Sequence, residues 1–331
     1  MQNNLTKKDI EKLNKWAKKY DIKKLQTKYK NKLLDIKELM LGELSRAEKN
    51  FSYIPNEIFK LVNLKELYIK SINLKALPKD IGNLINLEEL TIGSNCKLKK
   101  LPKEIGKLTN PKKLEIRCEK LNELPKELFN LTNLKEFEIR SENLVKLPKE
   151  ICNFSKLENI EIACENLKEL PHEIGNLKKL KYFTLWESNL KKFPKEFGNL
   201  INLEYFKIYS SYSLKEFPKE IANFTKLIHL TIECYKMKEL PREIGNLINL
   251  KSIYIKSANL KELPKEIKNL VNLERIDIIW DGYAKELPNE ILNFEKLKFI
   301  EIKKSGFIYK SFGREYKIEK AKKKIKKNIN K

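Results

Sequence analysis

An internal repeat marked by proline constrains the fold of this chain more than any other feature. Eleven of its twelve prolines are spaced 23 or 24 residues apart, and an acidic residue follows two positions after each of the eleven. A period of this length is typical of solenoids, in which each unit packs against its neighbours. The chain of 331 residues therefore predicts one elongated array with end pieces. The repeating prolines are Pro55, Pro78, Pro102, Pro125, Pro148, Pro171, Pro194, Pro218, Pro241, Pro264 and Pro288.

The copy that begins at Pro241 shows the helical half of the repeat. Proline suits the first position of a helical turn because no needed hydrogen bond is lost there. The carboxylate of Glu243 faces the positive end of the helix dipole. Ile244 and Leu247, three residues apart, share the inner face of the turn. Asn246 stands where a residue that tolerates left-handed backbone geometry can end it.

The strand half of the same copy follows directly. Ile253 and Ile255 alternate with Ser252 and Tyr254, as in a strand with one buried face. One short strand buries too little by itself, but stacked copies form a continuous core and a parallel sheet. After an irregular first unit at Ile36, Leu39 and Leu41, strands are expected at 64–69, 87–92, 111–116, 134–139, 157–162, 180–185, 203–208, 227–232, 250–255, 273–278 and 297–302.

These units resemble the leucine-rich repeat family, in the class with the 23-residue pattern LPxEIxxLxxLxxLxI. The resemblance covers the tandem copies within residues 36–302. It implies an α/β solenoid, a right-handed superhelix shaped as a horseshoe or arc. The family's fold has a parallel concave β-sheet, here of about twelve strands, with short helical turns on the convex side. The family generally serves protein binding, so the resemblance also implies an interaction module.

One column departs from the family pattern. The family usually has an asparagine three residues after the second apolar strand position, where it ties neighbouring loops together. Here only Asn95 fits that column, which otherwise holds residues such as Ile72, Glu119 and Ser188. Asparagine appears one place later, at Asn73, Asn143, Asn166, Asn189 and Asn259. We therefore expect altered loop geometry and curvature.

Two end segments flank the array. Residues 1–35 predict an N-terminal helical cap, with Thr6 and Asp9 as its helix start and a second short helix from Asp21. An apolar stripe at helical spacing supports the cap, formed by Ile10, Leu13, Trp16, Ala17 and Tyr20. Residues 303–331 form a basic C-terminal tail that could cap the last repeat, lie on an anionic membrane or contact phosphates.

The charge of the chain is strongly positive and concentrated at its ends. The formal net charge is +24, of which residues 1–50 carry +7 and residues 303–331 carry +10. Such an excess can indicate a nucleic acid or an anionic membrane as partner. The interpretation that we favour is a lysine-rich composition that solvates the outer face of the array.

No catalytic or metal-binding arrangement emerges. The two histidines are His172, expected on the surface, and His229, expected on the open side of a strand. Five scattered cysteines predict no disulfide framework, and Cys118 and Cys164 would lie about 10 Å apart, too far to bridge. The start of the chain lacks the apolar run of a signal peptide, and no stretch of about 18 apolar residues could span a membrane. We therefore expect a cytoplasmic, reducing location, no cofactor and no enzymatic activity.

The open, concave face of the sheet is the most informative surface. Successive strands bring equivalent positions about 4.8 Å apart, which aligns side chains in columns. Exposed tyrosine and tryptophan are typical of protein-binding hot spots, although both also suit exposed strand positions. We expect the partner-binding residues to be Tyr182, Trp186, Tyr205, Tyr209, His229, Tyr254 and Trp280. Earlier strands instead carry Glu115, Glu138 and Glu161 beside Arg117 and Arg140, as cross-strand neutralisation or a polar rim.

Three functions follow from these features. The first is a non-enzymatic, monomeric interaction module that binds a protein or peptide on the concave sheet. The second is a nucleic-acid or anionic-membrane binder that uses the basic ends, with an affinity that falls steeply with salt. The third is a released bacterial virulence factor or adhesin, suggested by the resemblance to spirochaetal relatives.

Overall fold

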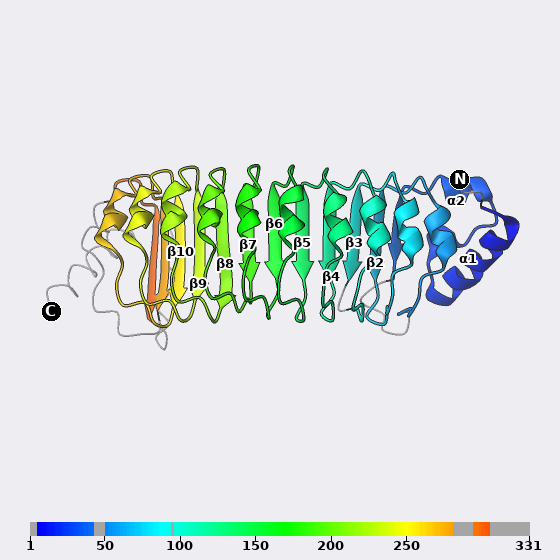
Figure 1. Ribbon diagram of the computed structural model, residues 1–331, viewed down its shortest axis with the longest axis horizontal. Helices are drawn as coiled ribbons and strands as arrows, with labels where there is room; N and C mark the ends of the chain where they lie inside the picture. The colour runs from blue at the N-terminus through cyan, green and yellow to red at the C-terminus, as the bar shows by residue number, and fades with distance from the viewer. Residues whose placement is uncertain (1–4, 43–49, 94–95, 281–293, 305–331) are drawn as a thin grey trace. The chain divides into compact units, whose positions relative to one another are not determined.

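The computed structural model describes residues 5–42, 50–93, 96–280 and 294–304 (Figure 1). The chain divides into two compact units, Met1–Glu165 and Asn166–Lys331, and each is considered by itself. In both units the strands run parallel and follow one another in sequence order, which confirms the predicted fold class. The predicted division into cap, array and tail stays a prediction.

Each unit contributes six of the twelve described strands. Those of the first unit are β1 (Glu38–Leu41), β2 (Glu66–Lys70), β3 (Glu89–Gly93), β4 (Lys113–Arg117), β5 (Glu136–Arg140) and β6 (Asn159–Ala163). Those of the second are β7 (Tyr182–Trp186), β8 (Tyr205–Ser211), β9 (His229–Cys234), β10 (Ser252–Ser257), β11 (Arg275–Trp280) and β12 (Phe299–Lys304). Most begin two residues later than predicted, because the leucine at the predicted start still belongs to a turn. Leu250, for example, donates its N–H to the carbonyl of Leu247 at 2.9 Å.

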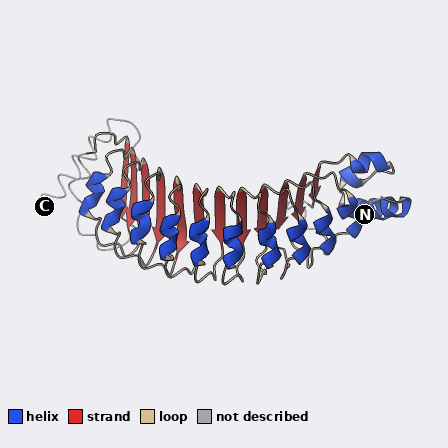
Figure 2. Cartoon of the chain, turned by 45° about the horizontal axis from the view of Figure 1, so that its top comes forward, coloured by secondary structure: helices blue, strands red, loops and turns tan. Residues whose placement is uncertain are grey.

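A five-residue 3₁₀ helix precedes most strands and packs on one side of them (Figure 2). The first unit contains η3 (Asn56–Lys60), η4 (Lys79–Asn83), η5 (Lys103–Lys107), η6 (Lys126–Asn130) and η7 (Lys149–Asn153). The second contains η8 (His172–Asn176), η9 (Lys195–Asn199), η10 (Lys219–Asn223), η11 (Arg242–Asn246) and η12 (Lys265–Asn269). The opposite side of the strands is left open, and we call it the open face.

Two predicted details of the helical turn are wrong. Pro241 precedes the helix as its N-cap, and its carbonyl accepts the N–H of Ile244 at 3.1 Å. Asn246 is not left-handed, since Asp21, Glu187 and Ser210 are the described non-glycine residues with positive φ. A 3₁₀ helix can end without a left-handed residue because the next N–H, here that of Leu247, closes a last bond to Ile244.

The core lies between the strands and the 3₁₀ helices. Ile244, Leu247, Ile253 and Ile255 are all fully buried, as the pattern predicted. In the second unit six phenylalanine rings form one cluster with Phe206 at its centre, and the five other ring centroids lie 5.2 to 5.9 Å from that of Phe206. The other members of this phenylalanine cluster are Phe183, Phe193, Phe197, Phe217 and Phe224.

A buried column of serine and cysteine lies one residue before the position at which the family usually has its asparagine. The hydroxyls of Ser71, Ser141 and Ser257 donate to main-chain carbonyls 20 residues earlier, at 2.6, 2.7 and 3.0 Å. Cys164 and Cys234 are buried at the end of their strands, and burial raises the pKa of each thiol to about 12. These small buried side chains join neighbouring loops, and the amide of Asn259 adds a further link, since its Nδ2 donates to Tyr235 O of the preceding repeat at 2.8 Å.

We expect Ser141→Ala to lower the free energy of unfolding by about 2 kcal/mol. The hydroxyl donates to Leu121 O and also accepts the N–H groups of Asn143 and Leu144 at 3.1 and 3.2 Å, so alanine would leave buried polar groups without partners. Denaturant titration measures the loss. Ser155→Ala, at an exposed turn position, is the control and should change the stability little. An equal effect of both substitutions would contradict this account of the column.

Asparagines form a second set of links between repeats, at the turn after seven of the ten helices η3–η12. Their Nδ2 atoms donate to a main-chain carbonyl of the preceding repeat at 2.7 to 2.9 Å. These amide links involve Asn63, Asn86, Asn110, Asn133, Asn202, Asn249 and Asn272. The asparagines can be read from the sequence, but the hydrogen bonds that they form were not predicted from it.

Helix α1 (Lys7–Tyr20) precedes the first strand, together with η1 (Lys23–Leu25) and α2 (Lys30–Leu34). Thr6 and Asp9 form the predicted capping box. Asp21 does not start a helix; it ends α1 in a left-handed conformation with φ 57°. The ring of Trp16 lies 5.2 Å from that of Phe51, and Asp9 pairs with Lys60 at 2.8 Å. Through these contacts α1 packs against the first full repeat.

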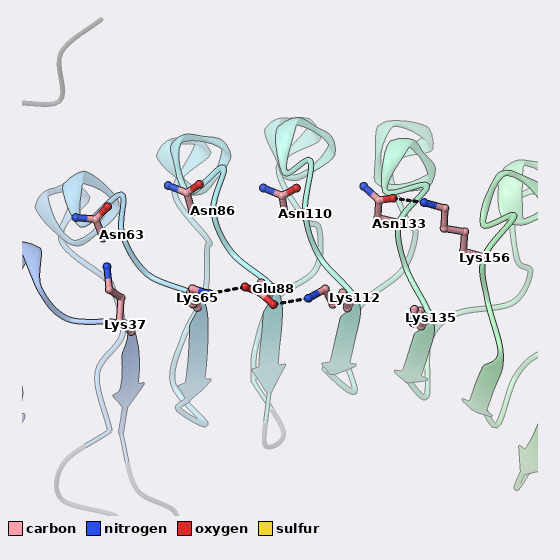
Figure 3. A pocket seen from close by; sticks show the side chains of 10 residues that line it. All are labelled: Lys37, Asn63, Lys65, Asn86, Glu88, Asn110, Lys112, Asn133, Lys135 and Lys156. Carbon is pink, nitrogen blue, oxygen red and sulfur yellow. Dashed lines mark hydrogen bonds and ion pairs between the residues drawn. The ribbon is translucent and has the colours of Figure 1, made fainter.

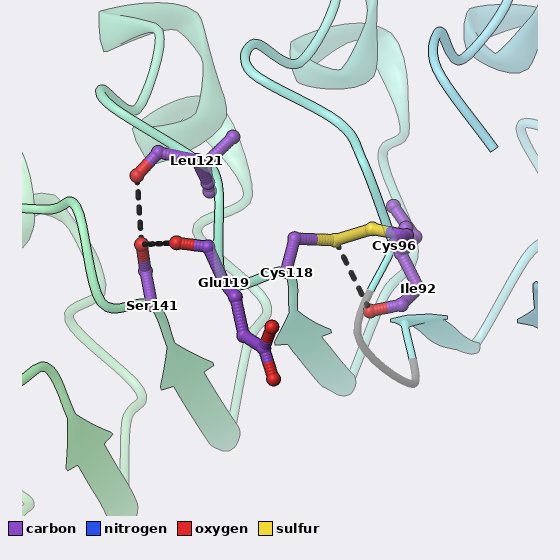
Figure 4. The surroundings of a disulfide bond; sticks show 6 residues. All are labelled: Ile92, Cys96, Cys118, Glu119, Leu121 and Ser141. Atoms are coloured by element: carbon purple, nitrogen blue, oxygen red, sulfur yellow. Dashed lines mark hydrogen bonds between the residues drawn. A yellow bond between two sulfur atoms is a disulfide. The ribbon is translucent and has the colours of Figure 1, made fainter. Parts of the chain in front are cut away.

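A disulfide bond joins Cys96 to Cys118, whereas the cysteine spacing predicted none (Figure 4). Both residues are fully buried. They lie 22 residues apart, about one repeat, so stacking brings them to equivalent loops of neighbouring repeats with Cα atoms 5.0 Å apart. Disulfides are typical of oxidising compartments, so this bond argues against the predicted reducing location. The cytoplasmic location stays a prediction.

Candidate interaction surface

The open face of the second unit carries a column of three stacked rings. Strand pairing places Tyr182 beside Tyr205 and Tyr205 beside His229. Each neighbouring pair has ring centroids 4.7 Å apart and planes within 20° of parallel, at 18° and 19°. The parallel strands impose this stack, since equivalent residues of adjacent strands must lie side by side.

A second column stands at the end of the same strands. The rings of Trp186 and Tyr209 are stacked with centroids 4.0 Å apart and an interplanar angle of 18°. The residue after each of these rings, Glu187 and Ser210, has positive φ, at 43° and 53°. A positive φ at a non-glycine residue is strained and persists only where surrounding contacts stabilise it. Residues of this kind cluster at functional sites. Here one of the contacts is the N–H of Glu187, which donates to Tyr209 O at 2.9 Å.

The charge state of His229 suits a stacked ring. Burial lowers its pKa below the usual value, and the nearby Lys207 and Lys251 lower it further. The imidazole is therefore neutral at pH 7, and it can stack on Tyr205 without carrying a charge. The ammonium of Lys207 lies 5.9 Å from the centroid of Tyr205, so a cation borders the column.

Two of the seven predicted site residues stand apart from these columns. Tyr254 occupies a different column of β10, beside Thr231 and Asp277. Burial raises the pKa of its phenol, and the carboxylate of Glu233, which accepts a hydrogen bond, raises it further. Trp280 is the last residue of β11, and its side chain lies outside the described part of the chain. The structure thus brings together Tyr182, Trp186, Tyr205, Tyr209 and His229.

One aromatic pair was missed by the sequence analysis. Tyr212 and Tyr235 directly follow β8 and β9. Their rings stack with centroids 5.2 Å apart and planes at 13°. Tyr212 is 52% exposed, so the pair extends the aromatic surface beyond the strands. The two residues are 23 positions apart, and that spacing was the signal that could have found them.

A family model described as a leucine-rich repeat region matches residues 12–146 and 126–242, well over half of the chain. The chain belongs to the leucine-rich repeat family. This family is generally a non-enzymatic interaction fold. No curated protein matches the sequence.

Solved structures agree with this assignment. A leucine-rich repeat protein of Leptospira interrogans is 27% identical, with 90% of this chain and 85% of that chain covered and a TM-score of 0.60. An internalin from Listeria monocytogenes is 18% identical, with 89% of each chain covered and a TM-score of 0.65. A chain of the Drosophila Toll–Spätzle complex is 19% identical over 76% of this chain and 37% of that chain, with a TM-score of 0.64.

In this leucine-rich repeat protein the open face of the first unit is polar and paired within itself. Arg117 binds both carboxylate oxygens of Glu138, at 2.6 and 2.7 Å, and contacts Glu115 at 3.1 Å. Lys113 pairs with Glu115 at 2.9 Å. Of the two interpretations of these charges, cross-strand neutralisation describes the contacts of Arg117. Groups already paired in this way have less to offer a partner than the open aromatic columns.

Other candidate features give no second site on the described face. His172 is exposed beside Glu173, as predicted. Within the described residues no three His, Cys, Asp or Glu side chains are grouped to hold a metal ion. No helix in the described ranges has the length and apolar character needed to cross a membrane. The predicted basic tail from residue 305 onward lies outside the described residues.

Proposed function

We propose that this leucine-rich repeat protein is a non-enzymatic interaction module that binds a protein or peptide on the open face of its second unit. The two stacked aromatic columns on that face carry the proposal. Trp186 and Tyr209 would form the centre of the contact, with Tyr182, Tyr205 and His229 beside them. No cofactor is required for such binding, and the protein would act as a monomer.

The geometry favours binding through these rings for an energetic reason. Tyrosine and tryptophan supply large contact areas, and they dominate the binding energy of many protein interfaces. The stacks already restrict the rings before a partner arrives, so less conformational entropy remains to be lost on binding. One structural neighbour was solved as a chain of the Drosophila Toll–Spätzle complex.

The first test is a pull-down from lysate of the source cell followed by affinity measurement with the captured protein. We expect Trp186→Ala to weaken that affinity by about 30-fold, the effect of a hot spot worth about 2 kcal/mol. Tyr53→Ala, a 56% exposed tyrosine outside the columns, is the matched control and should leave the affinity unchanged.

A truncated chain that ends at Lys304 separates this proposal from binding by the basic tail. The aromatic surface should act without the tail, so the truncated protein should keep its partner. If Trp186→Ala binds as well as the unaltered protein while truncation abolishes capture, the open face is not the site. Capture of nucleic acid or lipid lost only on truncation would favour the basic ends instead.

A further inference from the structure

A basic trough runs along the first unit, between the strand starts and the turns that follow the 3₁₀ helices (Figure 3). Its volume is about 490 Å³. Its lining contains five lysines and one carboxylate, that of Glu88. Four repeats contribute both the residue that precedes a strand and a turn asparagine. Lys37 also precedes a strand, whereas Lys156 occupies the turn position itself and donates to Oδ1 of Asn133 at 2.7 Å. The lysines are Lys37, Lys65, Lys112, Lys135 and Lys156.

The trough keeps a net positive charge. Glu88 pairs with Lys65 at 2.8 Å and with Lys112 at 2.6 Å, and these contacts, first that of Lys112, lower its pKa to about 2. It therefore stays ionised at neutral pH. Among the described residues, no ion pair involves Lys37 or Lys135. Two ammonium groups thus remain open to an anionic ligand.

The asparagines add acceptors to this basic surface. The Nδ2 atoms of Asn63, Asn86 and Asn110 already donate to carbonyls of the preceding repeat, at 2.9, 2.9 and 2.8 Å. Their Oδ1 atoms accept no hydrogen bond from the described residues, so the oxygen is the atom through which each amide can bind a ligand. Figure 3 shows these amides along the trough, in line with one another.

A ligand for this surface must carry both negative charges and hydrogen-bond donors. A phosphodiester backbone offers anionic acceptors, and amide oxygens would face it unfavourably. An extended acidic peptide has carboxylates for the lysines and main-chain N–H groups for the amide oxygens. The row from Lys37 to Lys135 crosses five strand starts, about 19 Å at the usual strand spacing, which equals about six extended residues.

We propose that the basic trough binds an extended acidic peptide segment of a partner protein. The carboxylates would pair with Lys37 and Lys135, and peptide N–H groups would donate to Asn63, Asn86 and Asn110. This site is independent of the aromatic columns in the second unit and stands whether or not those columns bind a partner.

The test uses the full chain and a fluorescein-labelled peptide of alternating glutamate and glycine, followed by fluorescence anisotropy. The double substitution Lys37→Glu/Lys135→Glu should weaken binding by about tenfold or more, because two unpaired charges are reversed without breaking an ion pair of the protein. The control is Lys215→Glu/Lys251→Glu, at two exposed positions of the second unit. It alters the net charge by the same amount and should change the affinity less than threefold.

A second peptide tests the role of the amide oxygens. Alternate N-methylation removes main-chain donors while the carboxylates stay, so this peptide should bind about tenfold more weakly. Equal loss in both charge-reversal variants would show attraction by net charge only and overturn the proposal. It would also be overturned by equal affinity of the methylated peptide, or by single-stranded oligothymidine that binds more tightly than the peptide and competes with it.

Discussion

Phe206→Ala is expected to lower the free energy of unfolding by about 4 kcal/mol. Phe206 is fully buried in β8 at the centre of the phenylalanine cluster. Its ring contacts both the strand layer, through Phe183, and the helix layer, through Phe197, with centroids at 5.7 and 5.2 Å. Alanine would remove apolar contacts on all sides and leave a cavity that rigid neighbours fill poorly. Urea titration followed by circular dichroism measures the loss.

Phe206→Leu provides the matched control for this cavity. Leucine keeps most of the buried apolar volume, so its cost should be less than half that of alanine. If leucine and alanine destabilised the protein equally, ring packing in the phenylalanine cluster would not be the cause. A loss below about 1 kcal/mol for alanine would show that the cluster does not stabilise the second unit.

Loss of the Cys96–Cys118 disulfide should be the second large effect, at about 3 kcal/mol. The bond closes a loop with a sequence separation of 22 residues. Closing a loop of this length lowers the chain entropy of the unfolded state by an amount equivalent to about 3 kcal/mol. Cys118→Ser is a suitable substitution because the equivalent position of the next repeat is a buried serine, Ser141. Thermal unfolding with and without a reducing agent measures the effect.

The controls for this prediction lie in the protein itself. Reduction should destabilise the unaltered chain but have no further effect on Cys118→Ser, since no bond remains to be broken. Cys152→Ser, at a partly exposed free cysteine, should leave the melting temperature unchanged. A melting temperature of the unaltered chain that does not respond to reduction would show that the disulfide does not stabilise the fold.

Stability and binding should separate between the core side and the open face of β7 and β8. Phe206 points into the core, whereas Tyr205 and Tyr209 belong to the open face, because side chains alternate along a strand. Substitution of the core ring should weaken both the fold and any binding that depends on it. Substitution of Trp186 should weaken binding with little loss of stability, since that side chain is not buried.

The sequence by itself determined the repeat, the parallel strands and the alignment of side chains into columns. A period of 23 or 24 residues and an alternation of two within each strand suffice for this, because stacking places equivalent residues side by side. The stacked pairs Tyr182–Tyr205 and Trp186–Tyr209 were predictable for the same reason. Tyr254 lies in another column of its strand, beside Thr231 and Asp277.

Only the tertiary structure decided the contacts that depend on loop conformation. The Cys96–Cys118 bond, the hydroxyl bond of Ser141 and the left-handed Glu187 all lie where the chain leaves a strand, and no simple period describes backbone there. The basic trough was hidden for a related reason. In the sequence, the recurring lysines and asparagines suggested only a solvated surface. The structure shows that the asparagine Nδ2 atoms donate to main-chain carbonyls, which leaves the Oδ1 atoms to accept hydrogen bonds from a ligand.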